Sequence, residues 1–233
     1  TGTASGSISS GCFMAYEDFT LKKFPARRVN MKSTQLFVIT IIIFCLTGIF
    51  SFHLTVNAQE KVNIDDVLTV IHRRKSVRKY LDKPVTRQQL ITLMKAGMAA
   101  PTAADKRPWA FVTVTDKALL DSLSHSSPSG KMLKNAAAAI VVCGDTRRAL
   151  NSNVWTQDCS AASQNILLAA EGIGLGGVWI GIYPEYFKYN HIRRVLGIPM
   201  EVVPLSILSI GWPTGAEKPK EKFDPANIHW NVW

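Results

Sequence analysis

Four short apolar segments of strand length, each separated from the next by a helical pattern, limit the fold of this chain more than any other feature. The strand segments are 109–115, 137–143, 176–183 and 202–210. The helical segments are 63–71, 86 to about 100, 117–125, 155–171 and 185–196. The second of these helices begins with a capping box formed by Thr86 and Gln89. This order predicts a mixed α/β or α+β domain in which helices cover one layer of sheet.

A long apolar run, residues 36–52, precedes this domain. It follows the short basic start Met31-Lys32 and is followed by Val56-Asn57-Ala58. A basic start, an apolar middle and a small-residue site are typical of a secretory signal, here cleaved after Ala58. Because the run is long for a signal, an uncleaved membrane anchor is the alternative.

The cations before the apolar run bear on where the domain lies. They are Lys22, Lys23, Arg27, Arg28 and Lys32. Since positive flanks stay on the cytoplasmic side, we expect the domain to be exported, either periplasmic or anchored and facing outward. A cytoplasmic location is the alternative.

Three regions follow from these patterns. Residues 1–30 begin without a methionine and open with a Thr/Gly/Ser-rich stretch, and Met31 is the expected start, so residues 1–30 are expected to be a non-native or disordered upstream segment. Residues 31–58 are the signal peptide or anchor, and residues 59–233 form one globular domain.

Charge and composition exclude several classes of function. The formal net charge is +10, but the basic residues after Gln59 are dispersed and do not form a stripe interleaved with aromatic residues, so we do not expect nucleic-acid binding. The five histidines show no i, i+4 pair, so no metal site is expected. Cys143 and Cys159 lie in apolar or small-residue contexts and are expected to be core thiols.

The stretch from His72 to Tyr80 contains five lysines and arginines and the hydroxyl of Ser76. A small donor flanked by guanidinium and ammonium groups suits a phosphate. The alternative interpretation is a solvated helix end.

Residues 172–177, Gly-Ile-Gly-Leu-Gly-Gly, match the dinucleotide-binding pattern G-x-G-x-x-G. That motif must follow a strand and open a helix, whereas here a helix precedes and a strand follows, so a Rossmann site is not expected. We expect the glycines to end the helix and to let backbone amides approach a flat group. A plain structural linker is the alternative.

From about Asp65 to Trp233 the chain resembles the flavin-dependent nitroreductase family in four motifs that occur in the family's order. Arg-Lys-Ser-x-Arg at 74–78 stands where the family has Arg-x-Ser-x-Arg/Lys. Ala-Pro-Thr-Ala-Ala-Asp-Lys-Arg-Pro-Trp at 100–109 stands where the family has Ala-Pro-Ser-x-x-Asn-x-Gln-Pro-Trp. The others are the glycine-rich stretch 172–181 and a tail with Glu-Lys-Pro at 217–219 and His-Trp at 229–230.

The resemblance implies an α+β domain with a central mixed or antiparallel sheet flanked by helices. It also implies a homodimer with a domain-swapped tail and two FMN molecules in clefts at the subunit interface. Arg74, Lys75 and Ser76 would then hold the phosphate and ribityl oxygens. Arg78 would approach the pyrimidine edge of the flavin, where a cation stabilises the charge that develops on reduction.

The family's remaining FMN contacts transfer to other motifs of this chain. Pro101 and Thr102 would contribute from the partner subunit, and the backbone at Gly181 and Ile182 would face flavin N5. Lys218, Lys220 or Lys222 would complete the phosphate clamp. Asp105 stands where the family has Asn, and it could accept a hydrogen bond from flavin N3–H. Because Arg107 stands where the family has Gln, we hypothesise an Asp105–Arg107 pair that neutralises the extra carboxylate.

The activity implied is electron transfer from NAD(P)H through flavin N5 to a small aromatic or quinone-like acceptor, with ping-pong kinetics and no catalytic side chain. One alternative is reductive dehalogenation or flavin fragmentation on the same fold, although the segment 122–134 is short for the lid that those activities use. Others are a non-enzymatic extracytoplasmic flavin carrier and a membrane-anchored interaction domain.

Overall fold

The computed structural model describes residues 64–233, together with Val38. The expected upstream segment and the leader therefore lie outside the described residues, apart from Val38, and remain predictions. Among the described residues, no helix combines the length and the apolar composition that a membrane crossing requires.

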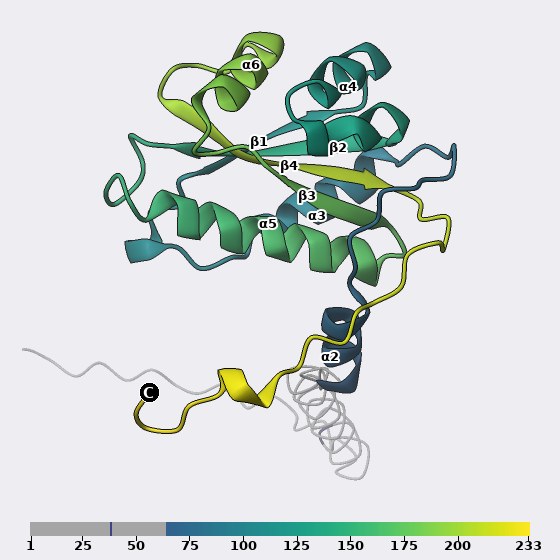
Figure 1. The fold of residues 1–233 in the computed structure, drawn as a ribbon. Coiled ribbons are helices and arrows are strands. Elements are labelled where there is room, and N and C mark those ends of the chain that lie inside the picture. Colours follow the sequence, from purple (N-terminus) through teal and green to yellow (C-terminus); the bar gives the residue numbers. More distant parts are fainter. Residues whose placement is uncertain (1–37, 39–63) are drawn as a thin grey trace, which may run out of the picture. The chain divides into compact units, whose positions relative to one another are not determined.

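Four antiparallel strands form one sheet with the order β1-β2-β4-β3 (Figure 1). Their bounds are Trp109–Val114 for β1, Ala138–Asp145 for β2, Gly176–Gly181 for β3 and Val202–Gly211 for β4. All eight residues of β2 are buried, because this strand has a neighbour on each side and helices over both faces. The predicted strands and the single helix-covered sheet are confirmed, and all of the pairing within the sheet is antiparallel.

Helices cover both faces of the sheet (Figure 1). One face packs against α3 and α5, and the other against α4 and α6. The helix bounds are Ile64–Arg73 for α2, Arg87–Met98 for α3, Lys117–Ser124 for α4, Trp155–Gly172 for α5 and Tyr186–Leu196 for α6. Because strand side chains alternate, Ile140 and Val142 of β2 enter the core beside α5, whereas Val141 and Cys143 enter the core beside α6. Each face of the sheet thus contributes to its own apolar cluster.

Local sequence signals place the ends of several helices. The Thr86 capping box is confirmed, since its hydroxyl accepts from the Gln89 amide and the Gln89 side chain accepts from the Thr86 amide. Asp116 caps α4 by accepting from the Leu119 amide. Gly197 ends α6 in the left-handed region, with a φ of 64°.

Cys143 and Cys159 are the core thiols that the sequence predicts. Both are free and fully buried, and the Cys159 thiol donates to the Cys143 carbonyl at 3.4 Å. Burial raises the pKa of each thiol to about 12, so both stay protonated and unreactive at neutral pH.

The glycine-rich stretch lies between α5 and β3, which confirms that it is not a Rossmann motif. A Cβ atom on Gly176 would lie 2.6 Å from Val77 Cγ2, and one on Gly177 would lie 2.9 Å from the Ser209 carbonyl oxygen. These two glycines therefore admit neighbouring parts of the same chain. The expectation that they admit a flat ligand is wrong for Gly176 and Gly177, because protein atoms already fill that space.

Candidate functional site

The segment after α2 runs along the start of β3. Ser76 forms a parallel bridge with Gly177, and the Val77 amide donates to the Gly177 carbonyl at 3.0 Å. Val77 is fully buried against Gly176, whereas Arg78 is exposed and Ser76 is partly exposed. Since side chains alternate along extended backbone, anchoring Val77 turns its two neighbours away from the core.

A hollow of about 390 Å³ lies beside this segment. Its lining comes from two parts of the chain that are far apart in sequence, and it holds six cations, one carboxylate and one hydroxyl. The lining residues are Arg74, Lys75, Ser76, Arg78, Glu217, Lys218, Lys220 and Lys222. The structure thus brings together the six residues that the resemblance assigns to the phosphate end of the cofactor, and it places Arg78, assigned to the pyrimidine edge, beside them. We call this the cationic hollow.

Glu217 joins the two parts. Its Oε1 atom accepts from the Arg78 amide at 2.8 Å and from the Lys79 amide at 3.1 Å. Burial acts to raise the pKa of Glu217, but these backbone hydrogen bonds outweigh it, so the pKa lies below its ordinary value. The carboxylate is therefore ionised at neutral pH and holds the tail against the cationic segment.

Glu171, at the C-terminal end of α5, partly neutralises the cationic segment. Its carboxylate lies 3.1 Å from Lys75 Nζ and 3.7 Å from Arg73 Nε, and its side chain is only 10% exposed. Within residues 64–233, the other cations of the hollow form no ion pair. They are Arg74, Arg78, Lys218, Lys220 and Lys222. The cationic hollow thus keeps an unpaired positive charge, which suits a phosphate.

The loop from Pro101 to Arg107 lies beside the N-terminal end of α5, where it contacts Asp158. The Ala103 amide donates to Oδ1 of the buried Asp158 at 3.0 Å, and the Arg107 amide donates to Thr102 Oγ1 at 3.1 Å. Arg148 also donates to the Arg107 carbonyl. These bonds fix a loop that would otherwise be a short polar connection.

Asp105 and Arg107 form the pair that we hypothesised. Arg107 Nε and Nη2 donate to the two carboxylate oxygens at 2.7 and 2.6 Å, and both side chains are exposed. The hydrogen bonds from Arg107 lower the pKa of Asp105, so the carboxylate stays ionised. The Arg107 guanidinium balances its negative charge. Both residues have positive φ, 52° and 49°, a conformation that non-glycine residues adopt rarely and often at functional sites.

Within one chain, the loop and the cationic hollow are far apart. Asp158 holds the loop and Glu171 holds Lys75, and these two carboxylates are thirteen residues apart on α5. At 1.5 Å per residue the separation is about 20 Å along the helix. Pro101, Thr102 and Asp105 therefore do not meet Arg74, Lys75 and Ser76 within a single chain.

At the far end of β3, Gly181 is exposed and nothing would lie within 4 Å of a Cβ atom there. Ile182 is buried, and its amide donates to the Leu205 carbonyl at 3.1 Å. The Ile182 N–H is thus already used within the sheet. Of these two predicted residues, Gly181 leaves its backbone most open to a ligand.

Comparison with known proteins identifies the family to which this fold and site belong. A model of the nitroreductase family matches residues 71–129 and 124–212. The chain belongs to the nitroreductase family. It is 41% identical, over 77% of its own length and 94% of the relative's, to a Methanothermobacter thermautotrophicus protein assigned as an NADH dehydrogenase/NAD(P)H nitroreductase.

Solved nitroreductase structures superpose on the chain. One, assigned as an NADH dehydrogenase/NAD(P)H nitroreductase from Parabacteroides distasonis, has 47% identity and a TM-score of 0.69, covering 72% of this chain and 98% of that one. An FMN-dependent nitroreductase from Clostridium difficile has 31% identity and a TM-score of 0.67, and the match covers 71% of this chain and 99% of that chain. The nitroreductase fold predicted from the four motifs is confirmed.

Three carboxylates that shape this nitroreductase site escaped the sequence analysis. Glu217 lies in the Glu-Lys-Pro motif, but the motif did not show that its carboxylate would bind backbone amides. Glu171 and Asp158 lie in none of the four motifs, and each binds a different segment, Glu171 the Lys75 side chain and Asp158 the Ala103 amide. The sequence signal that could have indicated both roles is the presence of one acidic residue near each end of the long helix α5.

Proposed function

We propose that this nitroreductase is an FMN-dependent NAD(P)H oxidoreductase that passes electrons to a small aromatic or quinone-like acceptor by a ping-pong mechanism. The observation that carries the proposal is the cationic hollow, which unites the Arg74–Arg78 segment with the Lys218–Lys222 tail. The names of the relatives from M. thermautotrophicus and C. difficile support the nicotinamide donor and the FMN cofactor respectively.

The residues of the cationic hollow fit the phosphate end of FMN. Arg74, Lys218, Lys220 and Lys222 supply charged donors, and the Ser76 hydroxyl supplies a neutral one. Arg78 would stabilise negative charge at the pyrimidine edge. When bound, FMN supplies reversible hydride transfer at N5, which none of these side chains can perform. The chain itself binds FMN, orients it and neutralises its charge. In a ping-pong mechanism, the donor and the acceptor then use the same pocket in turn.

We also propose that the functional unit is a homodimer with an exchanged tail. The loop that carries Pro101, Thr102 and Asp105 lies about 20 Å from the cationic hollow along α5, so a second copy is needed to supply it. The tail supports the same proposal, because four of its large apolar side chains are more than two-thirds exposed. These are Phe223, Trp230, Val232 and Trp233.

Export through the predicted leader is part of the proposal, and it bears on the donor. Because nicotinamide nucleotides are expected inside the cell, either the physiological donor is different and the flavin chemistry stays the same, or the apolar segment does not export the domain. Locating the chain by cell fractionation, with a cytoplasmic protein as the control, tests this element separately.

The activity is tested on the purified chain by its visible spectrum, followed by addition of NADH or NADPH without oxygen. We expect a yellow protein that bleaches, and a bleached sample that recovers its colour with a quinone. A yellow protein that neither NADH nor NADPH bleaches would refute the nicotinamide donor and would point to a flavin carrier or to an exported enzyme with another donor. A colourless protein that takes up no added FMN would refute the cofactor.

A charge-reversal variant ties this result to the hollow. Lys220→Glu places a carboxylate among the phosphate donors and should weaken FMN binding at least tenfold. Lys95→Glu is the matched control, because Lys95 lies in the last turn of α3 and not in the hollow. Equal FMN affinity in the two variants would show that the cationic hollow does not hold the phosphate.

A further inference from the structure

Arg193 on α6 is a buried cation without a charged partner. The residue is 7% exposed, and no carboxylate of residues 64–233 lies within ion-pair distance of it. Burying a charge is costly unless the charge is paired and fully hydrogen-bonded. The only cation–π contact of Arg193 among the described residues is with the Tyr189 ring, 6.0 Å from Arg193 Cζ, and this ring carries no full charge, so the guanidinium still lacks an anion.

The hydrogen bonds of Arg193 are incomplete and all go to neutral groups. Nη1 donates to Asn190 Oδ1 at 3.3 Å, and Nη2 donates to the Pro199 carbonyl at 3.1 Å. Nε is buried and has no partner among the described residues. Since a guanidinium offers five N–H donors, the larger part of its capacity is unused.

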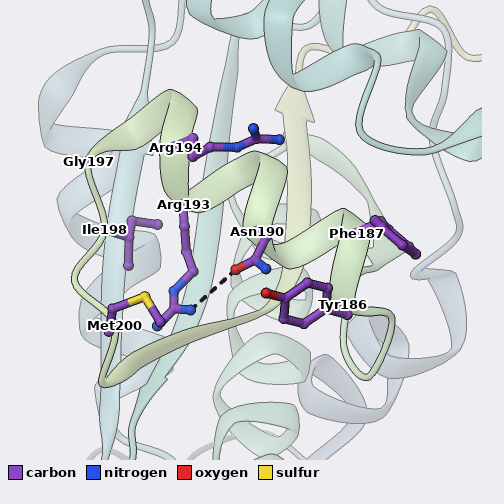
Figure 2. Close-up of a pocket in the computed structure, with 8 residues that line it drawn as sticks. All are labelled: Tyr186, Phe187, Asn190, Arg193, Arg194, Gly197, Ile198 and Met200. Atoms are coloured by element: carbon purple, nitrogen blue, oxygen red, sulfur yellow. Dashed lines mark hydrogen bonds between the residues drawn. The ribbon is translucent and has the colours of Figure 1, made fainter.

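Arg193 lies at a hollow of about 620 Å³ formed by α6 and the loop that follows it. The wall contains two arginines, two aromatic rings and no acidic residue, and the lining residues are Tyr186, Phe187, Asn190, Arg193, Arg194, Gly197, Ile198 and Met200. Figure 2 shows the Arg193 guanidinium between Met200 and Asn190, with the Tyr186 hydroxyl turned toward the same space. The Arg194 guanidinium extends away from them.

We propose that this hollow, which we call the α6 pocket, binds a small aromatic carboxylate. A carboxylate matches the planar fork of a guanidinium, and the Tyr186 hydroxyl and Asn190 amide can donate to its oxygens. The ring would lie against Tyr186, Phe187 and Met200, which are large and exposed. The volume falls in the range that small-molecule sites occupy.

The α6 pocket is separate from the phosphate end of the proposed flavin site, and the predicted N5 contacts Gly181 and Ile182 precede α6 and do not line the pocket. It shares no residue with the cationic hollow, and α6 covers the face of the sheet opposite to α5, whose C-terminal Glu171 pairs with Lys75 (Figure 1). The inference therefore does not depend on the cofactor. It makes the pocket a second binding site on the chain.

Benzoate is the probe, and its binding to the full chain is measured by calorimetry, with neutral benzamide for comparison. We expect saturable binding of benzoate, benzamide at least tenfold weaker, and a thermal midpoint that rises with benzoate concentration. Arg193→Met should weaken benzoate at least tenfold. Arg194→Met, the matched control, should change the affinity less than threefold.

Asn190→Asp keeps the test decisive if Arg193→Met does not fold. The new carboxylate would lie beside Arg193 Nη1, would pair with the guanidinium internally, and should weaken benzoate at least tenfold while raising the thermal midpoint. If the parent chain takes up neither benzoate nor benzamide, or binds both equally, Arg193 only ties α6 to the loop before β4 and the proposal is overturned. Equal benzoate affinity in the parent and in Asn190→Asp would overturn it as well.

Discussion

Replacing Glu217 with glutamine removes the charge from the contact that joins the tail to the cationic segment, while keeping its size and one oxygen. Both amide hydrogen bonds, from Arg78 and Lys79, end on Oε1. A hydrogen bond to a charged group contributes about 1.5–3 kcal/mol, against about 0.5–1.5 for a neutral one. Because the two bonds share one oxygen, we expect the contact to lose roughly 1.5–2 kcal/mol.

Amide hydrogen exchange at Arg78 and Lys79 measures this loss directly, since each amide must leave the carboxylate before it exchanges. At 1.4 kcal/mol per tenfold, both amides should exchange on the order of 10–30 times faster in Glu217→Gln. The global thermal midpoint should change little, because the contact lies at the surface of the domain. Glu221→Gln is the matched control, since Glu221 binds only the nearby Lys222 and Phe223 amides.

The pH dependence of the same exchange gives a second check on Glu217. Its pKa is lower in the folded chain than in the unfolded chain, so the contact is fully present above the ordinary glutamate value of about 4.3 and is lost as the pH falls through the folded value. After correction for intrinsic exchange, protection should therefore fall only in acid. Unchanged exchange at Arg78 and Lys79 in Glu217→Gln would refute the reasoning that the carboxylate holds the two segments together.

Three other predictions concern the glycine contact, the loop pair and the thiols. Gly176→Ala should overpack against Val77 by about 1–3 kcal/mol and lower the thermal midpoint by roughly 3–10 °C, whereas Gly172→Ala, with only Val70 at 3.9 Å, should be nearly neutral. Asp105→Asn should raise the flavin midpoint potential, Arg107→Gln should lower it, and the double variant should lie near the parent; unchanged potentials in both single variants would exclude an electrostatic role for the pair. Because burial raises their pKa to about 12, Cys143 and Cys159 should resist iodoacetamide at pH 8 in the folded chain and react once it is unfolded, as peptide mapping would reveal.

The sequence predicted those parts of the structure that depend on local pattern. The strands follow from apolar runs bounded by turn residues and the start of α3 from the Thr86 capping box, whereas the Asp105–Arg107 pair follows from two departures from the family motif in one short loop. The roles of Glu217 and Glu171 could not be predicted in this way. Their partners lie more than 90 residues away, and two of those partners are backbone amides, which no residue type marks.

The glycine-rich stretch shows that a motif can indicate where a close contact occurs without indicating what makes that contact. A glycine permits close approach but does not specify what approaches. Here Val77 fills the space at Gly176, and it does so because the residues on either side of it must face outward into the cationic hollow. Gly176 thus serves the predicted phosphate site indirectly, by allowing the Arg74–Arg78 segment to lie close along β3.

The length of α5 is what makes a second copy necessary to the proposed site. Its two ends hold the two halves of the site about 20 Å apart, and a rigid helix cannot bring them together. In a two-fold dimer with antiparallel α5 helices, the Asp158 end of one copy would lie beside the Glu171 end of the other. The face formed by Gln157, Ala161, Gln164 and Leu168 suits this pairing, because it recurs at helical spacing, is not fully buried and includes the small Ala161 for close approach. Each site would then take its cationic hollow from one copy and its Asp105 loop from the other, which explains why both halves are well built within one chain and yet separate.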